Sequence, residues 1–378
     1  MKICFVTHKV KKGDGQGRVN YEIIKEAIQQ GNKVIVVSTE LSNDLRNCPS
    51  ITWFKIEAKF IPTNLLKNQF FAVASYVLFW LRIIKADLIV VNGFITYAKS
   101  DFNCVHLVHS AWANSEYHPF RTKKNIKTSY HYFYNRVNGF LEKIAFKKTR
   151  HVIAVSDQVK RELHFHAKVN SSSITVIHNG VDTDEFAPKI LDRRKYNLKD
   201  GTIYGLFAGD LNSGIKNFET VLTALTKIKD LELLVLGNAE KSHYPSMAKK
   251  LGINNRVHFL GYRSDISNIM SLADIFIFPS RYESFSLVIL EAMAAGLPVI
   301  TSDRCGVIEL MTENSAFILS NPDNTDQLST LIRSLINNPE KMNQMSIEAR
   351  SVALQNQWTA MAKKYLEYIN KEFELQQI

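Results

Sequence analysis

Short apolar runs alternate with longer amphipathic segments along almost the whole chain. Runs this short, rich in Val, Ile, Leu and Phe, predict strands buried on both faces, as in a parallel sheet. They are 2–7, 33–38, 88–91, 104–108, 151–155 and 174–177 in the first half, and 204–207, 233–236, 257–260, 275–278 and 299–301 in the second. Because strands and helices alternate in both halves, the pattern predicts an α/β protein of two doubly wound Rossmann-like domains with an interdomain cleft.

One break in this pattern predicts the domain boundary. Pro188 and the polar run 189–201 interrupt the alternation and have the composition of a linker. We therefore expect one domain over 1–188 and a second over 189–357. The C-terminal segment 358–378 is helical in pattern and longer than its domain needs, so we expect it to pack back on the N-terminal domain.

The longest apolar run, 70–84, has 15 residues and contains Arg82. That is short for a membrane span, so we predict a buried helix here. The N-terminus has neither the apolar stretch nor the small-residue cleavage site of a signal peptide. Of the four cysteines none forms a CxxC pair, and Cys4 and Cys104 lie in apolar runs, which predicts reduced core thiols. These features favour a cytoplasmic protein.

The positive charge is concentrated in one part of the chain. The formal net charge is +11, and all of this excess lies in the first half. It is densest in 121–150, where nine Lys and Arg residues, interleaved with Tyr and Phe, stand against one acid, Glu142. This segment is either a solvated helical face or a patch for an anionic membrane or an anionic acceptor. No nucleic-acid-binding motif accompanies it, so we expect no nucleic-acid partner.

The stretch 275–301 carries the clearest chemistry. Its pattern predicts strand, loop, helix and strand, with Glu283 in the loop and Glu291 one to two turns into the helix. Ser284 and Ser286 are candidate N-caps of this helix. Backbone N–H groups near 285–287 should lack helical partners, and together with the helix dipole they favour a phosphate.

Two features of the first half lie where open α/β sheets bind ligands, at the carboxyl ends of strands. A loop with Gly13, Gly15 and Gly17 follows the first strand, although it is not the GxGxxG of a dinucleotide site. His109 follows the strand 104–108, whereas His106 should point to the opposite face and pack as an ordinary core histidine.

Five short motifs along the chain can be compared with those of known protein families. PSRYESFSLVILEAMAAGLPVI at 279–300 has two glutamates eight positions apart, and HNGVDTDEF, VSDQVKREL, GDGQGR and VHFLGY occur at 178–186, 155–163, 13–18 and 257–262. Over nearly its whole length the chain thereby resembles the retaining glycosyltransferases of family 4, which have the GT-B architecture and an E-x7-E signature. The resemblance implies a metal-independent, retaining hexosyltransferase without a cofactor. It would use a UDP- or GDP-sugar donor and a glycan or lipid-linked acceptor in envelope polysaccharide synthesis.

The resemblance also implies roles for individual residues. Lys216 would neutralise the leaving diphosphate, Glu283 would hold the sugar or balance its developing positive charge, and His109 would reach the sugar from the other domain. Glu291 would accept hydrogen bonds from the ribose hydroxyls. The other donor-binding residues would be Gly15, Gly17, Gly209, Tyr262, Arg263, Phe285, Ser286 and Leu287. Together with the basic segment 121–150, this implies a cytoplasmic enzyme peripheral to the inner face of a membrane.

The sequence departs from the family pattern at two places. Asp210 stands where a phosphate-binding Arg is usual, so either Lys216 works alone, another base such as Arg281 or Arg263 substitutes, or donor binding is weak. Serines replace the usual glycines on both sides of Phe285, which matters if the loop needs a positive φ there. Two alternatives stay open. One is a sugar-nucleotide epimerase on the same architecture, which the basic first half disfavours, and the other is a non-catalytic nucleotide-sugar- or glycan-binding subunit, which Asp210 keeps open.

Overall fold

The structure, a computed structural model, describes residues 1–375 and divides into two compact units. One unit comprises residues 1–179 and the C-terminal segment from Trp358, and the other comprises residues 180–357. Residues 376–378 of the predicted C-terminal segment lie outside the described part of the chain. The division falls before the predicted boundary at 188, because the Val181 N–H donates to the Asn356 carbonyl (3.0 Å) and Arg350 donates to the Thr183 carbonyl (3.0 Å). These bonds tie the segment after residue 180 to the second unit.

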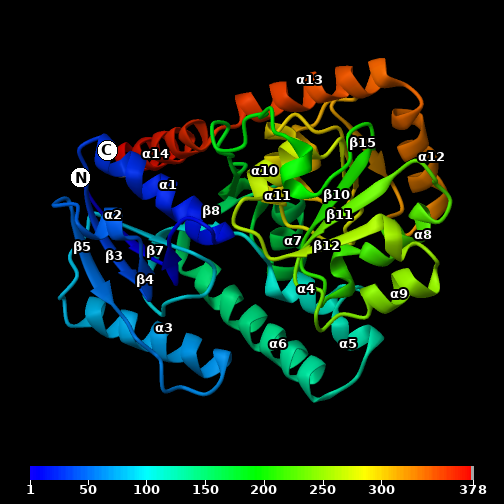
Figure 1. Cartoon of the computed structure of the whole chain (residues 1–378). Helices are drawn as coiled ribbons and strands as arrows, with labels where there is room; N and C mark the ends of the chain where they lie inside the picture. The colour runs from blue at the N-terminus through cyan, green and yellow to red at the C-terminus, as the bar shows by residue number, and fades with distance from the viewer. Residues whose placement is uncertain (376–378) are drawn as a thin grey trace. The chain divides into compact units, whose positions relative to one another are not determined.

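A parallel sheet of seven strands forms the centre of the first unit (Figure 1). Its strand order is β5-β3-β1-β6-β7-β8-β9, the order of a doubly wound sheet with its switch point between β1 and β6. The strands are β1 (Lys2–Val6), β3 (Lys33–Ser38), β5 (Ile51–Lys55), β6 (Leu88–Val91), β7 (Ser100–Val105), β8 (Thr149–Ala154) and β9 (Ile174–Val176), and β2 (Lys9–Val10) pairs separately with β4 (Glu40–Leu41).

Helices connect these strands. They are α1 (Gly15–Gln29), α2 (Asn43–Arg46), α3 (Asn64–Trp80), α4 (His109–Asn114), α5 (Pro119–Thr122), α6 (Ile126–Lys147), α7 (Asp157–Ala167) and α14 (Trp358–Glu374), with the 3-10 turn η1 (Ser171–Ser173). The C-terminal helix α14 packs against α1 within this unit, where the Arg18 guanidinium lies 5.6 Å from the Trp358 ring centre and Tyr365 is fully buried.

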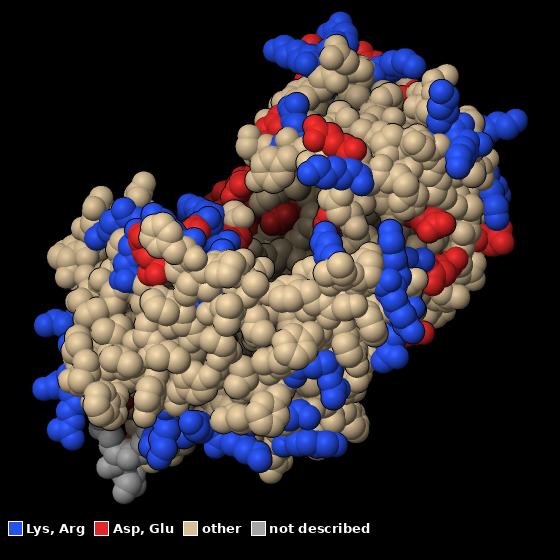
Figure 2. All heavy atoms as spheres, turned by 90° about the horizontal axis from the view of Figure 1, so that it is seen from below, with Lys and Arg blue, Asp and Glu red and all other residues tan. Residues whose placement is uncertain are grey.

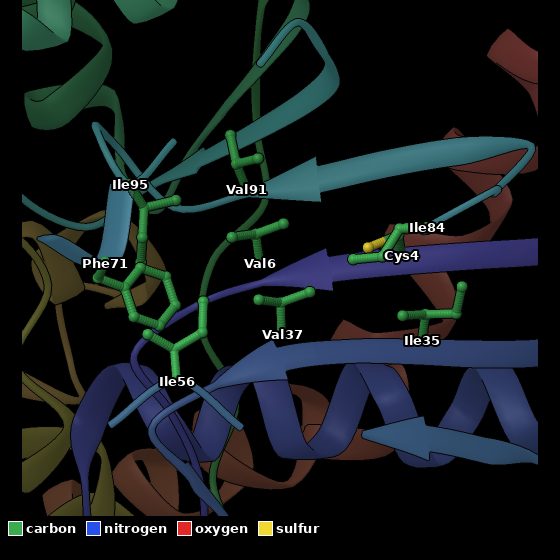
Figure 3. Packing of buried hydrophobic residues seen from close by; sticks show 9 residues of the cluster. All are labelled: Cys4, Val6, Ile35, Val37, Ile56, Phe71, Ile84, Val91 and Ile95. Carbon is green, nitrogen blue, oxygen red and sulfur yellow. The ribbon is translucent and has the colours of Figure 1, made fainter. Parts of the chain in front are cut away.

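Part of the core of the first unit lies between its sheet and α3. Figure 3 shows Cys4 and Val6 of β1, Val37 of β3 and Phe71 of α3 pointing into one apolar cluster, which also contains Ile56, Ile84 and Ile95. All four cysteines of the chain are free, and Cys4 and Cys104 are buried, as predicted. The prediction of a buried helix at 70–84 is wrong in its main point. The helix spans 64–80, and only one side of it is buried, because the sheet covers a single face of α3.

The second unit contains a parallel six-stranded sheet in the order β12-β11-β10-β13-β14-β15. This is the Rossmann order, with the switch point between β10 and β13. Its strands are β10 (Tyr204–Ala208), β11 (Glu232–Leu236), β12 (Val257–Gly261), β13 (Ile275–Phe278), β14 (Val299–Ser302) and β15 (Ala316–Leu319). Its helices are α8 (Phe218–Leu225), α9 (Tyr244–Lys250), α10 (Ile266–Leu272), α11 (Leu287–Ala294), α12 (Thr325–Ile336) and α13 (Pro339–Gln355), with the 3-10 turns η2 (Arg193–Tyr196), η3 (Gly214–Lys216), η4 (Asn254–Arg256) and η5 (Gly306–Leu310).

The apolar pattern missed four strands, the two-residue strands β2 and β4 and the longer β5 and β15, and it misplaced one. β5 and β15 are edge strands with several half-exposed residues, so they lack the continuous apolar run of a central strand. The strand predicted at 104–108 begins earlier and ends at Val105, so His109 is the first residue of α4 and not the end of a strand. Among residues 1–375, no helix has both the length and the apolar character needed to cross a bilayer.

Candidate functional site

Three glycines end three neighbouring strands of the second unit. Gly209 follows β10, Gly237 follows β11 and Gly261 is the last residue of β12. The Gly237 N–H donates to the Gly261 carbonyl (3.0 Å), and the Gly209 N–H donates to the Leu236 carbonyl (2.9 Å). A Cβ on Gly209 would lie 3.3 Å from both Lys216 Cγ and Phe278 Cε2, which form its immediate surroundings. Because glycines have no side chain, the carboxyl edge of this sheet stays free of side-chain atoms at these three positions. They lie beside the switch point, where open α/β sheets bind ligands.

Lys216 and Glu283 meet at this edge. The Lys216 Nζ contacts Glu283 Oε1, and the Ser280 hydroxyl donates to the same oxygen (3.2 Å). The Glu283 N–H donates to the Arg304 carbonyl (2.9 Å) and its carbonyl accepts from Gly306 N–H (3.0 Å), so the backbone fixes the loop that carries the carboxylate. Both side chains are largely but not completely buried. The structure thus brings together two of the three predicted catalytic residues as an ion pair that is still accessible to a ligand.

The start of α11 is strained. Ser286 occupies the N-cap position with φ +83° and ψ +87°, a conformation that disfavours any residue with a Cβ. Its hydroxyl makes no capping bond and is buried without a hydrogen-bond partner. The neighbouring Phe285 ring is buried, so only the backbone of this predicted donor-binding residue can meet a ligand. The prediction of a serine N-cap is correct for the position of Ser286 but wrong for its side chain.

Replacing Ser286 by glycine should stabilise the second unit by about 1 kcal/mol. The substitution removes a side chain from a residue with positive φ and also removes an unpaired buried hydroxyl. Glycine makes the unfolded chain more flexible, which cancels only part of this gain in stability. The urea midpoint of unfolding measures this effect. Ser284→Gly is the matched control and should not stabilise, because Ser284 has no positive φ. An unchanged or lowered midpoint for Ser286→Gly would contradict the assignment of strain to this residue.

The other predicted donor-binding residues of this unit lie at different places. Glu291 is the fifth residue of α11 and is half-buried, and Leu287 begins that helix. Tyr262 is almost fully exposed, and Arg263 pairs with Asp265 (2.7 Å), so neither is held against Lys216 by a described contact.

The acid at 210 and its possible substitute cation are also placed by the structure. Asp210 is exposed and accepts from the backbone N–H of Asn212 (2.9 Å). Arg281 donates to the Gly214 carbonyl (2.7 Å) and pairs with Asp323 (2.6 Å). Since Arg281 is engaged at η3, Lys216 is the cation that lies directly beside Glu283.

In the first unit His109 is held by Glu142, which the sequence analysis had counted as the one acid of the basic segment 121–150. The ring Nδ1 of His109 lies 2.6 Å from Glu142 Oε1, and the backbone N–H of His109 donates to Glu142 Oε2 (3.0 Å). Burial disfavours the charged ring, but the charge of Glu142 and its hydrogen bond outweigh this, and the pKa of His109 is raised. Glu142 is buried, so it does not reduce the positive surface charge of the segment 121–150, although counting charges in the sequence had included it there. Only tertiary packing reveals this pair, because 33 residues separate its members.

In the glycine loop of the first unit, the side chain of Asp14 caps the start of α1. Asp14 accepts from the Gly17 N–H (2.9 Å) and from Lys9 Nζ (3.2 Å), which places its carboxylate at the start of α1. Gly13 has the positive φ (+77°), and a Cβ on Gly17 would lie 3.0 Å from Asp14 Oδ1. Gly15 is the first residue of the helix. A phosphate at this helix start would therefore have to displace Asp14.

Two histidines near the same sheet edge are kept neutral. Burial lowers the pKa of His106 to about 4, although the charge of Asp14 opposes this shift, and the His106 Nε2 has no hydrogen-bond partner. Burial, with a smaller contribution from Lys9, also lowers the pKa of His8 to about 4. The prediction for His106 as a packed core histidine holds only in part, because the residue is half-buried and follows the end of β7, and its orphaned nitrogen was not foreseen.

A cavity of about 590 Å³ opens where β1, β3 and β5 end. It is lined by His8, Thr39, Ile56, Phe71 and other residues, among them the lysines 9, 55, 59 and 67 and the acids Glu40 and Glu57. Lys55 and Lys59 both pair with Glu57. The cavity therefore combines an apolar floor with a cationic rim, and the sequence pattern did not predict it because β5 was missed.

Among the residues that the structure describes, none are brought together as a metal-ligand cluster. Within residues 1–375, no three His, Cys, Asp or Glu side chains lie close enough to share a metal ion. Cys305, behind the Glu283 loop, is buried, and burial raises the pKa of its thiol to about 12.

Family models match both halves of the chain. Residues 13–185 match the model described as Glycosyltransferase Family 4, and residues 188–352 match the model described as Glycosyl transferases group 1. The chain spans only 51% to 57% of the length of the first curated relatives that it matches.

Three similar proteins illustrate the match. The N,N'-diacetylbacillosaminyl-diphospho-undecaprenol alpha-1,3-N-acetylgalactosaminyltransferase of Campylobacter jejuni is 26% identical and aligns over 98% of this chain and 99% of its own. The lipopolysaccharide glucosyltransferase WaaG of Escherichia coli is 26% identical over 52% of this chain and 55% of its own. The structure of Anabaena HepE in complex with UDP-glucose superposes with a TM-score of 0.73 over 98% of this chain and 100% of its own, at 21% identity.

The structural likeness extends to a crystal structure of WaaG, with a TM-score of 0.76 over 97% of this chain and 99% of that one. The two family models follow each other along the chain and together cover nearly all of both units. The chain belongs to the glycosyltransferases of family 4, with a group 1 C-terminal half and the GT-B fold of two Rossmann-like domains.

Proposed function

We propose that this protein transfers a sugar from a UDP- or GDP-linked donor to a glycan or lipid-linked acceptor in envelope polysaccharide synthesis. The observation that carries the proposal is the Lys216–Glu283 pair beside Gly209, at the switch point of the second sheet. It supports the donor assignment because a cation and a carboxylate together match a diphosphate and the sugar attached to it. The relative that acts on a diphospho-undecaprenol-linked acceptor supports the acceptor class.

The proposed reaction retains the configuration of the sugar and needs no metal. The bond between the sugar carbon and the β-phosphate oxygen breaks while the acceptor oxygen attacks from the same face, and the leaving phosphate takes the acceptor proton. Lys216 leaves its contact with Glu283 and binds the diphosphate, helped by the N–H groups at the start of α11. Glu283 then faces the sugar, whose positive charge it balances. A fixed cation near the developing phosphate charge replaces the role of a metal ion.

The donor and the acceptor occupy different parts of the protein in this proposal. Glu291 accepts from the ribose hydroxyls, and His109, oriented by Glu142, contributes a hydrogen bond to the sugar. The anionic head of the acceptor enters the cavity rimmed by Lys9, Lys55 and Lys67. The segment 121–150 has no exposed acid of its own to oppose its lysines and arginines. These cations bring the protein to the inner face of an anionic membrane.

Thermal shift against UDP-, GDP- and ADP-sugars tests the proposal. A ligand at 100 times its dissociation constant should add about 2.7 kcal/mol of stability. Glu291→Ala should abolish the shift with the free nucleotide as well as with the nucleotide sugar, whereas Glu283→Gln should keep the shift and lose turnover. The absence of a shift with every nucleotide sugar would refute the proposal, and a shift without donor hydrolysis or transfer would favour a non-catalytic binding subunit.

A further inference from the structure

α3 is a surface helix that has no polar face from residue 70 to its end. Leu66, Phe70, Val73, Val77 and Trp80 follow one another at intervals of three or four residues and thus form a single stripe along the helix. Their exposed fractions lie between 38% and 69%. The stripe is about 20 Å long at the rise of an α-helix. An apolar stripe of this length on a surface helix marks an interaction site.

The stripe is not explained by the fold, because α3 makes its core contact with the opposite side. Phe71, Ala72 and Ser75 are buried there, and Phe71 belongs to the core cluster of Figure 3. From residue 70 onward the helix is therefore almost apolar all round while only half of it is covered, a pattern that soluble surface helices avoid. The exposed apolar surface continues past the helix end through Leu81 and Ile83.

The charges on α3 and in the four residues after its C-cap are all positive, and the first acid after the helix is Asp87. α3 contains Lys67 and no Asp or Glu, and the exposed Arg82 and Lys85 follow it directly. The helix α6 lies beside its first turns, because the Leu65 N–H donates to the Tyr130 hydroxyl (3.2 Å) and Asn68 donates to the Tyr134 hydroxyl (2.7 Å).

The exposed side of α6 alternates aromatic and basic residues. Phe133, Arg136, Phe140 and Lys147 are all exposed and follow one another at helical spacing. Figure 2 views the molecule from the side on which α3 and α6 lie in Figure 1, and over these helices most of the surface is neither basic nor acidic, with Lys and Arg at its margins. The two helices thus present apolar stripes edged with cations.

We propose that α3 lies in the interfacial layer of an anionic lipid bilayer, with its exposed stripe among the acyl chains and the cations of α6 and 82–85 on the lipid headgroups. Trp80 and Tyr76 suit the boundary between headgroups and hydrocarbon, where aromatic side chains with a polar end are favoured. Long basic side chains at the rim reach the phosphates while their stems stay in apolar surroundings. The helix would lie in the plane of the interface and would not span the membrane.

Charge complementarity favours lipid over a second copy of this chain as the occupant. A symmetric dimer through this face would bring two copies of the same cationic surface together, including Arg82, Lys85 and Arg136, with no acid on α3 to compensate. An anionic bilayer supplies the opposite charge and an apolar interior at the same surface. The inference rests on the proposed function in one respect. Asn64, Lys67 and Asn68 at the N-terminal end of α3 line the lysine-rimmed cavity, so docking would present that cavity to the head of a lipid-linked acceptor.

Vesicle flotation of the full chain tests the inference. The probes are vesicles of phosphatidylcholine with and without phosphatidylglycerol, at low salt and at about 1 M salt, where the Debye length is about 3 Å. Native protein should float with anionic vesicles and keep part of this binding at high salt, because the apolar stripe is not screened. Phe70→Glu/Val77→Glu should lower the bound-to-free ratio at least tenfold at both salt concentrations. Arg136→Glu/Lys147→Glu should lower it mainly at low salt.

Matched controls place a new charge on exposed apolar residues elsewhere. Phe165 on α7 and Ile347 on α13 are 63% and 61% exposed, and Phe165→Glu and Ile347→Glu should change flotation less than twofold. The milder pair Val73→Ser/Val77→Ser should weaken binding at high salt without charge repulsion. Unchanged circular dichroism and an unchanged donor thermal shift establish that each variant is folded. Quenching of Trp fluorescence by brominated lipid should be lost largely in Trp80→Phe.

Two outcomes would overturn the inference. One is flotation of folded Phe70→Glu/Val77→Glu at the native level. The other is a native dimer in light scattering that this variant dissociates, which would make the stripe a subunit interface. Failure of the proposed function has a different signature, because vesicle binding through α3 would persist in a protein that no nucleotide sugar stabilises.

Discussion

Lys216→Ala is expected to lower the rate of sugar transfer about 100- to 1,000-fold, the loss typical of removing one group that stabilises developing negative charge. The Nζ of Lys216 contacts Glu283 at the edge of the second sheet, beside Gly209, and it is the cation nearest to that carboxylate. Its loss removes the proposed charge partner of the leaving diphosphate and also leaves Glu283 without its own partner. Turnover with saturating donor measures the effect.

A double-mutant cycle with Glu283→Gln sharpens this expectation. Because the two side chains are in contact, the loss in Lys216→Ala/Glu283→Gln should be much smaller than the product of the single losses. Lys227→Ala is the control, since Lys227 pairs with Asp326 on the surface of the same unit, and its rate should stay within twofold of native. A rate for Lys216→Ala within threefold of native would remove Lys216 from the proposed machinery.

Gly237→Ala is expected to destabilise the second unit by about 3 kcal/mol or more. Gly237 has φ +148°, which disfavours any side chain, and an added Cβ would overlap the carbonyl oxygen of Gly209. That carbonyl belongs to backbone and cannot swing away as a flexible side chain would. The expected readout is a large drop in the urea midpoint of unfolding, together with weaker donor binding, because Gly209, which lies beside Lys216, would have to move.

Gly252→Ala separates the effect of contact from the effect of φ alone. Gly252 has φ +70° in the same unit, and a Cβ there would meet nothing within 4 Å. Its replacement should cost about 1 kcal/mol, the strain of a left-handed residue without a clash. If both substitutions had the same small cost, the close approach of Gly237 to Gly209 would not constrain this sheet edge.

The apolar pattern of the sequence predicted most of the central strands well and missed two of the four edge strands of the two large sheets. β13 begins and ends where the pattern placed it, at 275 and 278, because a strand covered on both faces is a continuous apolar run. The edge strands β5 and β15 were missed because at least half of the residues in each are not buried, so their sequences do not form a continuous apolar run. The prediction for 70–84 was wrong for a related reason. Hydrophobicity shows that a helix can be buried, but the sheet decides which of its faces is covered.

The candidate site divides in the same way. The spacing of Glu283 and Glu291 and the loop-to-helix pattern between them follow from short-range preferences, so the sequence was sufficient to predict both carboxylates and the helix start. The pairing of Lys216 with Glu283 joins residues 67 positions apart, and that of His109 with Glu142 joins residues 33 apart. Neither leaves a local pattern, because each depends on how strands and helices are packed.

By itself, then, the sequence determined the alternation of strands and helices, the two-domain family and the stretch that carries the two glutamates. Each of these depends on residues near one another in the chain. The tertiary structure alone decided the strained φ of Ser286, the close approach of Gly237 to Gly209, the acid that holds His109 and the apolar side of α3 that stays uncovered. These features arise where distant segments meet or fail to meet, and sequence periodicity contains no information about such distances.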